Sequence, residues 1–434
     1  MRRVTLLLAL SFFVVTASTS LVGQRASAPA CDPDNGGLTL APGFCAKVVA
    51  DDLGPARNLV VAPSGDVYVA IQRGPRAPGQ PPQPGFLMAL RDTNGDGTLD
   101  QREKFGANGA TGIVLRNGYL YFATTTSVER FKLTPGQLAP TGAAEVLVGG
   151  FPEQRGHQDK DVAFDDKGNM FVTIGLPSNA CAQPDRQPGA KGVDPCPQLD
   201  NGGGVWKFSD TPGQTYSAKN RYATGLRQGL ALAWHDGHLY LAMNSRDSLD
   251  VLYPDHFTPD DNQNRPLEPL LQVNEGSVFG WPYCFYDGKV NTMILAPEYG
   301  GDGTAVGRCA QYEAPVAGFP AHSAPVDLQF FDSPALPAKY RGGAFVVMHG
   351  SWNRAPAPMQ GYNILYQPFA NGRPSGHYEV FADGFAGAKP LMKPEDAKFR
   401  PQGLAQARDG SMYISDEVKG RIWRVVYRGD TRTR

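Results

Sequence analysis

The sequence predicts an all-β protein, a six-bladed β-propeller with long loops on one face. One hairpin pattern recurs six times along the chain. The 434 residues include 51 Gly and 37 Pro, which favours many turns over long helices. No helical periodicity of useful length is present beyond the first thirty residues. Together these three features indicate a large fold built from short strands.

Each copy of the pattern is an apolar alternating strand, a polar turn with Gly, and a second alternating strand, which is typical of a β-hairpin. The fifth copy is looser, because Asp332-Ser-Pro lies in a longer turn. The copies occupy residues 58–70, 112–123, 161–173, 229–242, 326–348 and 403–415. A four-stranded blade needs about 40–50 residues, so each copy marks one blade. A β-sandwich of similar hairpins is the alternative fold.

Three stretches are expected to be long loops, at residues 73–84, 177–204 and 253–268, and two of them are rich in Pro, Gly and polar residues. Long propeller loops usually lie on one face and carry binding residues. The domain organisation predicted is a targeting segment, 1–30, followed by a single propeller domain, 31–434.

The first thirty residues have the layout of a secretory signal peptide. Arg2 and Arg3 form a positive start, residues 4–15 are apolar apart from Ser11, and small residues follow. An uncleaved anchor is the alternative, and a lipid anchor on Cys31 is disfavoured because Leu is absent three positions before it. We find no other apolar run of membrane-spanning length, so an exported protein, periplasmic or secreted, is expected.

Six cysteines follow the signal segment, and an even number in an exported chain indicates disulfides. Six cysteines allow 15 pairings. Because close neighbours bracket Pro- and Gly-rich loops, we predict the pairs Cys31–Cys45, Cys181–Cys196 and Cys284–Cys309. A zinc site is the weaker interpretation, since the sequence has no Cys-x-x-Cys and no nearby His spacing.

Charge and missing motifs exclude several functions. The net charge is −1, so nothing in the overall charge indicates a nucleic acid or an anionic membrane as partner. The sequence has no Cys-x-x-Cys-His haem motif and no Gly-x-Gly-x-x-Gly dinucleotide motif after a strand.

Residues 92–103 fit the twelve-residue calcium loop, although they lack its flanking helices. Its predicted ligands are Asp92, Asn94, Asp96, Thr98, Asp100 and Glu103, with Gly97 at the sharp turn. A calcium ion here would be structural. The alternative is an acidic turn that binds no metal.

Several short strings lie at the starts and ends of the hairpins. They are Gly156-His157-Gln158, Gly225-Leu-Arg227-Gln-Gly229, Asn244-Ser245-Arg246-Asp247, Gly280-Trp281-Pro282-Tyr283-Cys284, His349-Gly-Ser-Trp352-Asn353-Arg354 and Arg400-Pro-Gln-Gly403. In this order the chain resembles, over about residues 38–428, the soluble quinoprotein sugar dehydrogenases that use pyrroloquinoline quinone (PQQ). The resemblance is closer to the sorbosone-like branch, because Ser245-Arg246-Asp247 stands where the glucose-oxidising members have Gln-Gly-Pro.

The arginines of these strings support the same interpretation on physical grounds. Equivalent strand ends of different blades converge on one mouth of a propeller, so isolated arginines would meet there. Such a ring would be repulsive without an anion, and arginine suits bidentate contact with carboxylates, of which the cofactor has three. The cofactor-binding residues predicted are Arg57, Lys160, Arg227, Asn244, Arg246, His349, Asn353, Arg354 and Arg400. Surface ion pairs are the alternative for any one arginine.

The resemblance implies an enzyme that oxidises a sugar. His157 is the predicted general base, a calcium ion beside the quinone would be held partly by backbone carbonyls near Asp247 and Ser248, and electrons would pass to an external acceptor, a quinone or a cytochrome. A calcium-dependent propeller lactonase and a non-catalytic binding propeller are the alternatives. The lactonase interpretation is weaker, because the residues at the blade starts are mostly Arg and His rather than acidic ligands.

Overall fold

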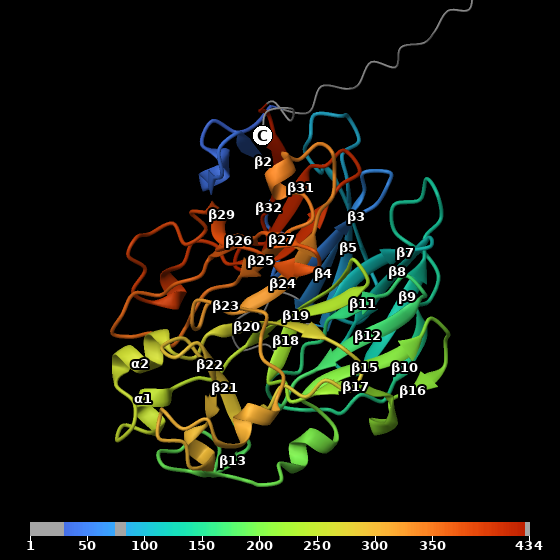
Figure 1. Cartoon of the computed structure of the whole chain (residues 1–434). Coiled ribbons are helices and arrows are strands. Elements are labelled where there is room, and N and C mark those ends of the chain that lie inside the picture. The colour runs from blue at the N-terminus through green and yellow to red at the C-terminus, as the bar shows by residue number, and fades with distance from the viewer. Residues whose placement is uncertain (1–29, 74–83, 430–434) are drawn as a thin grey trace, which may run out of the picture.

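The computed structural model describes residues 30–73 and 84–429, and over these residues the chain forms a six-bladed β-propeller (Figure 1). The prediction of the fold is therefore confirmed. The α-helices within the described residues are two short ones, α1 (Leu249–Leu252) and α2 (Pro259–Asn264). Of the predicted signal peptide, residues 1–29 lie outside the described residues.

Each blade is an antiparallel sheet whose four main strands follow one another in the chain from the central axis outward. The exception is the last blade, whose outermost strand comes from the N-terminal segment. The first three blades are β3 (Ala56–Val61), β4 (Val67–Arg73), β5 (Pro84–Arg91) and β6 (Gln101–Phe105); β7 (Ile113–Arg116), β8 (Tyr119–Ala123), β9 (Ser127–Lys132) and β10 (Glu145–Gly149); and β11 (Val162–Phe164), β12 (Asn169–Ile174), β15 (Gly204–Ser209) and β17 (Arg221–Thr224). The last three are β18 (Gln228–His235), β19 (His238–Asn244), β20 (Glu268–Val273) and β23 (Ala317–Phe319); β24 (Pro325–Phe330), β25 (Ala344–Met348), β26 (Asn363–Gln367) and β29 (Glu379–Asp383); and β30 (Pro401–Gln406), β31 (Met412–Asp416), β32 (Ile422–Tyr427) and β2 (Phe44–Ala50).

Shorter elements extend or connect the blades. β1 (Thr39–Leu40) pairs with β29, and β16 (Gln214–Thr215) runs parallel to β10. The two-stranded ribbons are β13 (Ala182–Gln183) with β14 (Lys191–Gly192), β21 (Cys284–Asp287) with β22 (Thr292–Leu295), and β27 (Phe369–Ala370) with β28 (Arg373–Pro374). The 3-10 turns are η1 (Asn35–Gly37), η2 (Pro197–Asp200), η3 (Ala218–Asn220), η4 (Pro297–Tyr299), η5 (Gly307–Gln311), η6 (Ala338–Tyr340) and η7 (Pro394–Asp396).

The core lies between the blades, because each inner sheet is covered on both faces. All five residues of β25 are buried, and so are all but the first residue of β12. The sequence reflects this, since these strands are almost continuously apolar instead of alternating with charged residues. Trp206 and Trp423, which lie in two different blades, are fully buried.

The N-terminal strand closes the ring. β2 pairs with β32 from Phe44 opposite Tyr427 to Ala50 opposite Ile422, so the last blade takes its outer strand from the start of the chain. In Figure 1 the blue strand β2 accordingly lies beside the red strands of the C-terminus. The Cys31–Cys45 disulfide joins the segment before β2 to β2 itself.

Two buried aspartates connect the inner strands of adjacent blades. Asp161 accepts a hydrogen bond from the backbone N–H of Leu232 at 2.9 Å, and Asp327 accepts one from Leu404 at 2.7 Å. The inner strands of four blades also carry a bulge near one end, for example between Ala56 and Leu59 of β3. Bulges of this kind redirect side chains beside functional sites.

All three predicted disulfides are confirmed. The predicted long loops at 177–204 and 253–268 both leave the propeller at the end from which the inner strands start, and they contain β13, β14, η2 and α2. Of the predicted loop at 73–84, residues 74–83 lie outside the described residues. None of the described helices combines the length and apolar character that a membrane span requires.

Candidate functional site

The mouth of the central channel, where the six inner strands begin, contains the candidate site. A cavity of about 570 Å³ opens there, and its walls include Arg57, Gln72, His157, Asp159 and Glu417. This volume is within the range of small-molecule sites. A cavity of about 830 Å³ beside α1 and one of about 570 Å³ around Asp66, on the opposite face, bring together none of the predicted cofactor-binding residues.

The first group of charged residues in the mouth surrounds Glu417, which follows β31. Arg57 on β3 reaches Glu417 with Nη1–Oε2 at 2.7 Å, and it also donates to Gln72 Oε1 at 3.0 Å. His349 Nε2 lies 3.2 Å from Glu417 Oε1. Burial alone would raise the pKa of Glu417, but His349 and the Arg57 guanidinium hold that pKa below its ordinary value.

Arg400 lies beside this group, immediately before β30. Its guanidinium donates to the carbonyl oxygens of Gly350 at 2.7 Å and His349 at 3.4 Å. Within the described residues it forms no ion pair with a carboxylate. Arg400 therefore retains a positive charge that main-chain oxygens hold in place but do not neutralise.

The second group is built around Asp247, in the loop after β19. Arg227 Nη2 donates to Asp247 Oδ2 at 2.6 Å, Arg186 Nη2 donates to the same oxygen at 2.8 Å, and Asn353 Nδ2 donates to Oδ1 at 2.8 Å. Burial opposes ionisation of Asp247, but Arg227 and Arg186 outweigh it and hold its pKa below the ordinary value. Asn353 Oδ1 is buried without a partner.

His157 lies between the two groups, in the loop before β11, and its backbone has a φ of +47°. Its Nδ1 is 2.5 Å from the carbonyl oxygen of Leu176. Since a carbonyl only accepts, Nδ1 carries the proton and Nε2 is left as the proton-accepting atom. Burial, and then the charge of Arg227, lower the pKa of His157 to about 3.

This pKa lies well below the ordinary value for histidine. The neutral form of His157 persists over the whole physiological range, because burial and a nearby cation disfavour the imidazolium. Strand periodicity and motif position gave no measure of that burial.

Other predicted residues do not face the cavity. Arg246 is fully buried and makes a bidentate pair with Glu298, at 2.7 and 2.8 Å, so the structure does not bring it together with the other predicted residues at the mouth cavity. Arg354 donates to the carbonyl oxygens of Gln263 and Pro358, so it joins its own loop to α2. Neighbouring side chains in an extended loop point in opposite directions, which separates Arg246 from Asp247.

Three further predicted residues make contacts within the protein. Lys160 is fully buried and its Nζ donates to the carbonyl of Gln158 at 2.9 Å, and Asn244 Nδ2 donates to the carbonyl of Pro325 at 2.9 Å. Ser248 has a φ of +61° and immediately precedes α1, and its carbonyl accepts from Leu252 N. The roles of Lys160 and Asn244 in cofactor binding stay predictions.

The acidic residues of the mouth were missed by sequence reasoning. Asp159 and Glu417 both lie beside Arg57, so the arginines have carboxylate partners within the protein. The sequence predicted a ring of arginines without carboxylates. The structure instead has a network of arginines and carboxylates at the mouth. Glu417 follows the second strand of the sixth hairpin, and the equivalent position of the fourth hairpin holds predicted site residues, so the repeat itself could have revealed it.

The predicted calcium loop lies in the turn between β5 and β6, on the face opposite the mouth. Asp92 accepts from the backbone N–H groups of Gly95 and Gly97 at 2.8 Å, and Asp100 accepts from Thr93. In the part of the chain that the structure describes, no three His, Cys, Asp or Glu side chains are grouped to hold a metal. Calcium binding by this loop stays a prediction.

The protonation of the mouth histidines can be measured in the absence of any cofactor. Burial lowers the pKa of His322 and of His349, as it does for His157. Because the pKa of His157 is lowered to about 3, we expect its Cε1 signal to keep the neutral chemical shift from pH 8 to pH 5 in carbon-13 NMR. The signals of His322 and His349 should titrate below the ordinary histidine value. Single His→Gln variants would assign the signals.

The same shifts determine how stability depends on pH. A folded-state pKa below the ordinary value means that the unfolded chain binds protons more readily. The contribution of His157 to stability is therefore complete above about pH 6.5 and is lost as pH falls toward 3. In the NMR titration, the Cε1 signal that is missing from the His157→Gln variant belongs to His157. A titration midpoint near pH 6.5 for that signal would contradict the burial of this side chain.

Comparisons with known proteins place the chain in a family. The family model described as TrAA12-like matches residues 38–428. Among solved structures, the calcium structure of the family AA12 carbohydrate-active enzyme from Trichoderma reesei is similar with a TM-score of 0.70 and 17% identity, over 90% of this chain and 97% of that chain. The holo form of the PQQ domain of pyranose dehydrogenase from Coprinopsis cinerea has a TM-score of 0.68 and 17% identity, over 93% of this chain and 99% of that chain.

One more solved structure and one curated sequence are also similar to the chain. The PQQ-bound aldose sugar dehydrogenase from Streptomyces coelicolor has a TM-score of 0.54 and 15% identity, over 89% of this chain and 99% of that chain. An uncharacterized protein from Borreliella burgdorferi is 28% identical over 209 residues, 47% of this chain and 48% of its own length, so the match spans about half of that curated relative. The structural neighbours establish the fold, and the family match covers most of the sequence. The chain belongs to the TrAA12-like family.

Proposed function

We propose that this protein is an exported, PQQ-dependent dehydrogenase that oxidises a sugar and passes the electrons to an external acceptor. The observation that carries the proposal is the arrangement of His157 in the mouth cavity. A neutral imidazole with its Nδ1 proton held by Leu176 O shares that cavity with Arg57, and Arg400 lies next to it. This combination suits proton removal next to a bound polyanion.

The residues of the mouth fit a flat cofactor that carries three carboxylates. Arg400 has no carboxylate partner among the described residues, and arginine binds carboxylates with paired donors. Asn353 Oδ1 is a buried polar atom without a partner, and a buried polar atom normally has one. We expect Arg400 and Asn353 to hold PQQ together with Arg57, Arg227 and His349, which belong to the same two groups of the mouth.

When bound, the quinone supplies the acceptor for the hydride that leaves the sugar carbon. His157 Nε2 takes the hydroxyl proton of the same carbon, and the hydrogen bond from Nδ1 to Leu176 O keeps the ring oriented for this transfer. The neighbouring arginines would offset the negative charge of the cofactor carboxylates. Proton transfer and hydride loss together convert the hydroxyl-bearing carbon to a carbonyl.

Calcium at the cofactor has less support from these residues. The carbonyl of Asp247 accepts from Asn179 Nδ2 at 3.2 Å, and the carbonyl of Ser248 accepts within α1. The Asp247 carboxylate is already held by Arg227, Arg186 and Asn353. The requirement for calcium stays a prediction.

Export is supported by the three disulfides, which persist in oxidising compartments. The acceptor would be a quinone or a cytochrome outside the cytoplasm. The substrate class proposed is an aldose or an aldosone, consistent with the sugar dehydrogenases among the structural neighbours.

Reconstitution tests the proposal. We expect the purified, cofactor-free protein to gain aldose dehydrogenase activity when PQQ and Ca²⁺ are added together, and neither addition to suffice alone. The measurement is the reduction of an artificial electron-accepting dye over a panel of aldoses, ketoses and sugar aldehydes.

Each outcome of this experiment has a meaning. Folded protein that takes up no PQQ would end the dehydrogenase proposal, and lactone hydrolysis by the quinone-free protein would favour the hydrolase alternative. Uptake of PQQ without oxidation of any sugar would contradict the substrate class alone. Full activity with PQQ in the presence of a calcium chelator would contradict the calcium requirement.

A further inference from the structure

Asn179 lies behind the Arg227–Asp247 pair, in the loop between β12 and β13, and nothing in its sequence context marks it as functional. The residue is 1% exposed. It stands two positions before Cys181, which forms a disulfide with Cys196. The loop therefore brings a buried amide to the edge of the mouth.

The polar atoms of Asn179 are directed at the two residues of that pair. Its Oδ1 accepts from Arg227 Nη2 at 3.1 Å and from the backbone N–H of Asp247 at 3.2 Å. Its Nδ2 donates to the carbonyl of Asp247 at 3.2 Å, and its own carbonyl accepts from Arg227 Nε at 3.3 Å. One residue thus fixes the direction of the guanidinium and both backbone groups of Asp247.

An amide is required for this arrangement. The side chain must accept from N–H groups on one side and donate to a carbonyl on the other, which a carboxylate cannot do when ionised. Buried donors and acceptors that lose their partners carry a large penalty, so the contacts hold the pair in one geometry.

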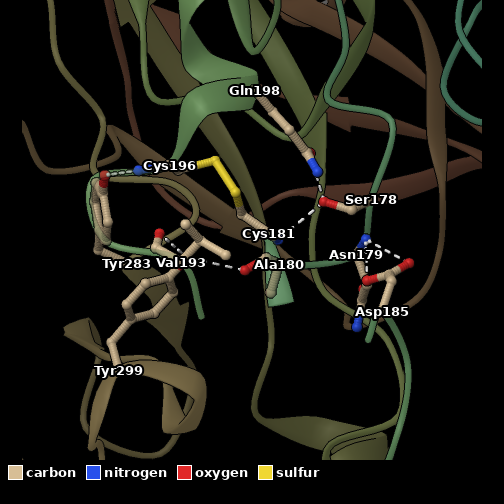
Figure 2. The surroundings of a disulfide bond; sticks show 10 residues. All are labelled: Ser178, Asn179, Ala180, Cys181, Asp185, Val193, Cys196, Gln198, Tyr283 and Tyr299. Carbon is tan, nitrogen blue, oxygen red and sulfur yellow. Dashed lines mark hydrogen bonds between the residues drawn. A yellow bond between two sulfur atoms is a disulfide. The ribbon is translucent and has the colours of Figure 1, made fainter. Parts of the chain in front are cut away.

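The Cys181–Cys196 disulfide and its neighbours hold Asn179 in this position (Figure 2). The backbone N–H of Asn179 donates to Asp185 Oδ1 at 3.1 Å, and the carbonyl of Ala180 accepts from the hydroxyl of Tyr299 at 3.0 Å. Cys181 N donates to Ser178 Oγ at 2.9 Å. The residues on both sides of Asn179 are therefore anchored, and the disulfide closes the loop behind them.

We infer that Asn179 is a positioning residue for Arg227 and Asp247, and that the Cys181–Cys196 disulfide supports cofactor binding through it. The inference rests on the proposed function, because it assigns Arg227 to the cofactor. It adds a role that the disulfide pattern alone does not suggest: this disulfide is part of the site, whereas Cys31–Cys45 holds the strand that closes the ring.

Asn179→Ala is the first test. The variant should bind PQQ about ten- to one-hundredfold more weakly, because a buried charged group loses its hydrogen-bond partners. Tryptophan fluorescence quenching by PQQ would give the Kd, and thermal unfolding would give the stability separately. A Kd within twofold of the wild-type value would overturn the inference.

Hydrogen exchange supplies a readout that needs no cofactor. In PQQ-free protein, the peptide containing Asp247 should exchange faster in Asn179→Ala than in the wild type, because the Asp247 N–H loses its acceptor. Peptides from β25 serve as an internal reference and should not change. Unchanged exchange at Asp247 would overturn the inference even if PQQ does not bind, whereas failure of the wild type to bind PQQ contradicts only the proposed function.

The disulfide has a matched control within the chain. Cys181 and Cys196 are separated by 15 residues and Cys31 and Cys45 by 14, so the two double Cys→Ser variants remove crosslinks that close loops of similar length. Both variants should unfold at lower temperature, but only Cys181→Ser/Cys196→Ser should weaken PQQ binding. Equal effects of the two pairs on the Kd would refute the link between disulfide and site, and if either pair fails to fold, the Asn179→Ala measurements decide alone.

Discussion

Replacing His157 with alanine is expected to lower the turnover number of the reconstituted protein by about two to four orders of magnitude, the usual effect of losing a general base. The reason is local, because Nε2 of His157 is the proton-accepting atom that lies in the mouth cavity with its ring held by Leu176 O. Steady-state dye reduction at saturating sugar and saturating PQQ would measure the change.

The cofactor affinity distinguishes this role from a structural one. His157→Ala should bind PQQ with a Kd within a few fold of the wild type, whereas Arg400→Ala should bind it much more weakly, since a cofactor carboxylate loses a charged partner. If His157→Ala loses less than tenfold in turnover while fully loaded with PQQ, another group removes the proton.

The largest effect on stability is expected at the Arg246–Glu298 pair. Both side chains are buried, and the guanidinium meets both carboxylate oxygens. Arg246→Met should lower the free energy of unfolding by about 3–5 kcal/mol, because Glu298 is left as an unpaired buried charge. Urea unfolding followed by far-ultraviolet circular dichroism would measure it.

A second substitution tests the cause. Arg246→Met/Glu298→Leu removes both charges and should recover most of the lost stability, since well-packed apolar residues often replace buried ion pairs without loss. The folded fraction of either variant should bind PQQ with unchanged affinity, because Arg246 does not face the cavity. If the Arg246→Met variant unfolds at the same urea concentration as the wild type, Glu298 has found another partner.

The blades were predictable because their signal is local. Each central hairpin needs two apolar strands and a Gly-containing turn within about a dozen residues, and the six copies correspond to the first two strands of the six blades. The origin of the outermost strand of the last blade was not predictable in this way. The pairing of β2 with β32 joins the two ends of the domain, and no short-range pattern at Phe44–Ala50 specifies so distant a partner.

The candidate site was predictable only in part. The convergence of blade starts placed Arg57, His157 and Arg400 at one mouth. It did not separate Arg246 from Asp247, because the direction of a loop side chain depends on tertiary packing. Glu298, which turns Arg246 away, comes from η4, far along the chain, and Asn179 comes from a long loop whose path depends on a disulfide.

The N-terminal origin of β2 also governs when the molecule can finish folding during synthesis. The chain emerges from its N-terminus, so β2 must wait for β32 while the first five blades assemble. Until Tyr427 is available, β2 has no partner and the open ring presents unpaired strand edges, which recruit other chains. We therefore expect a chain that ends before Ile422 to aggregate, although it contains every predicted site residue. Deletion of Phe44–Ala50 should have the same effect.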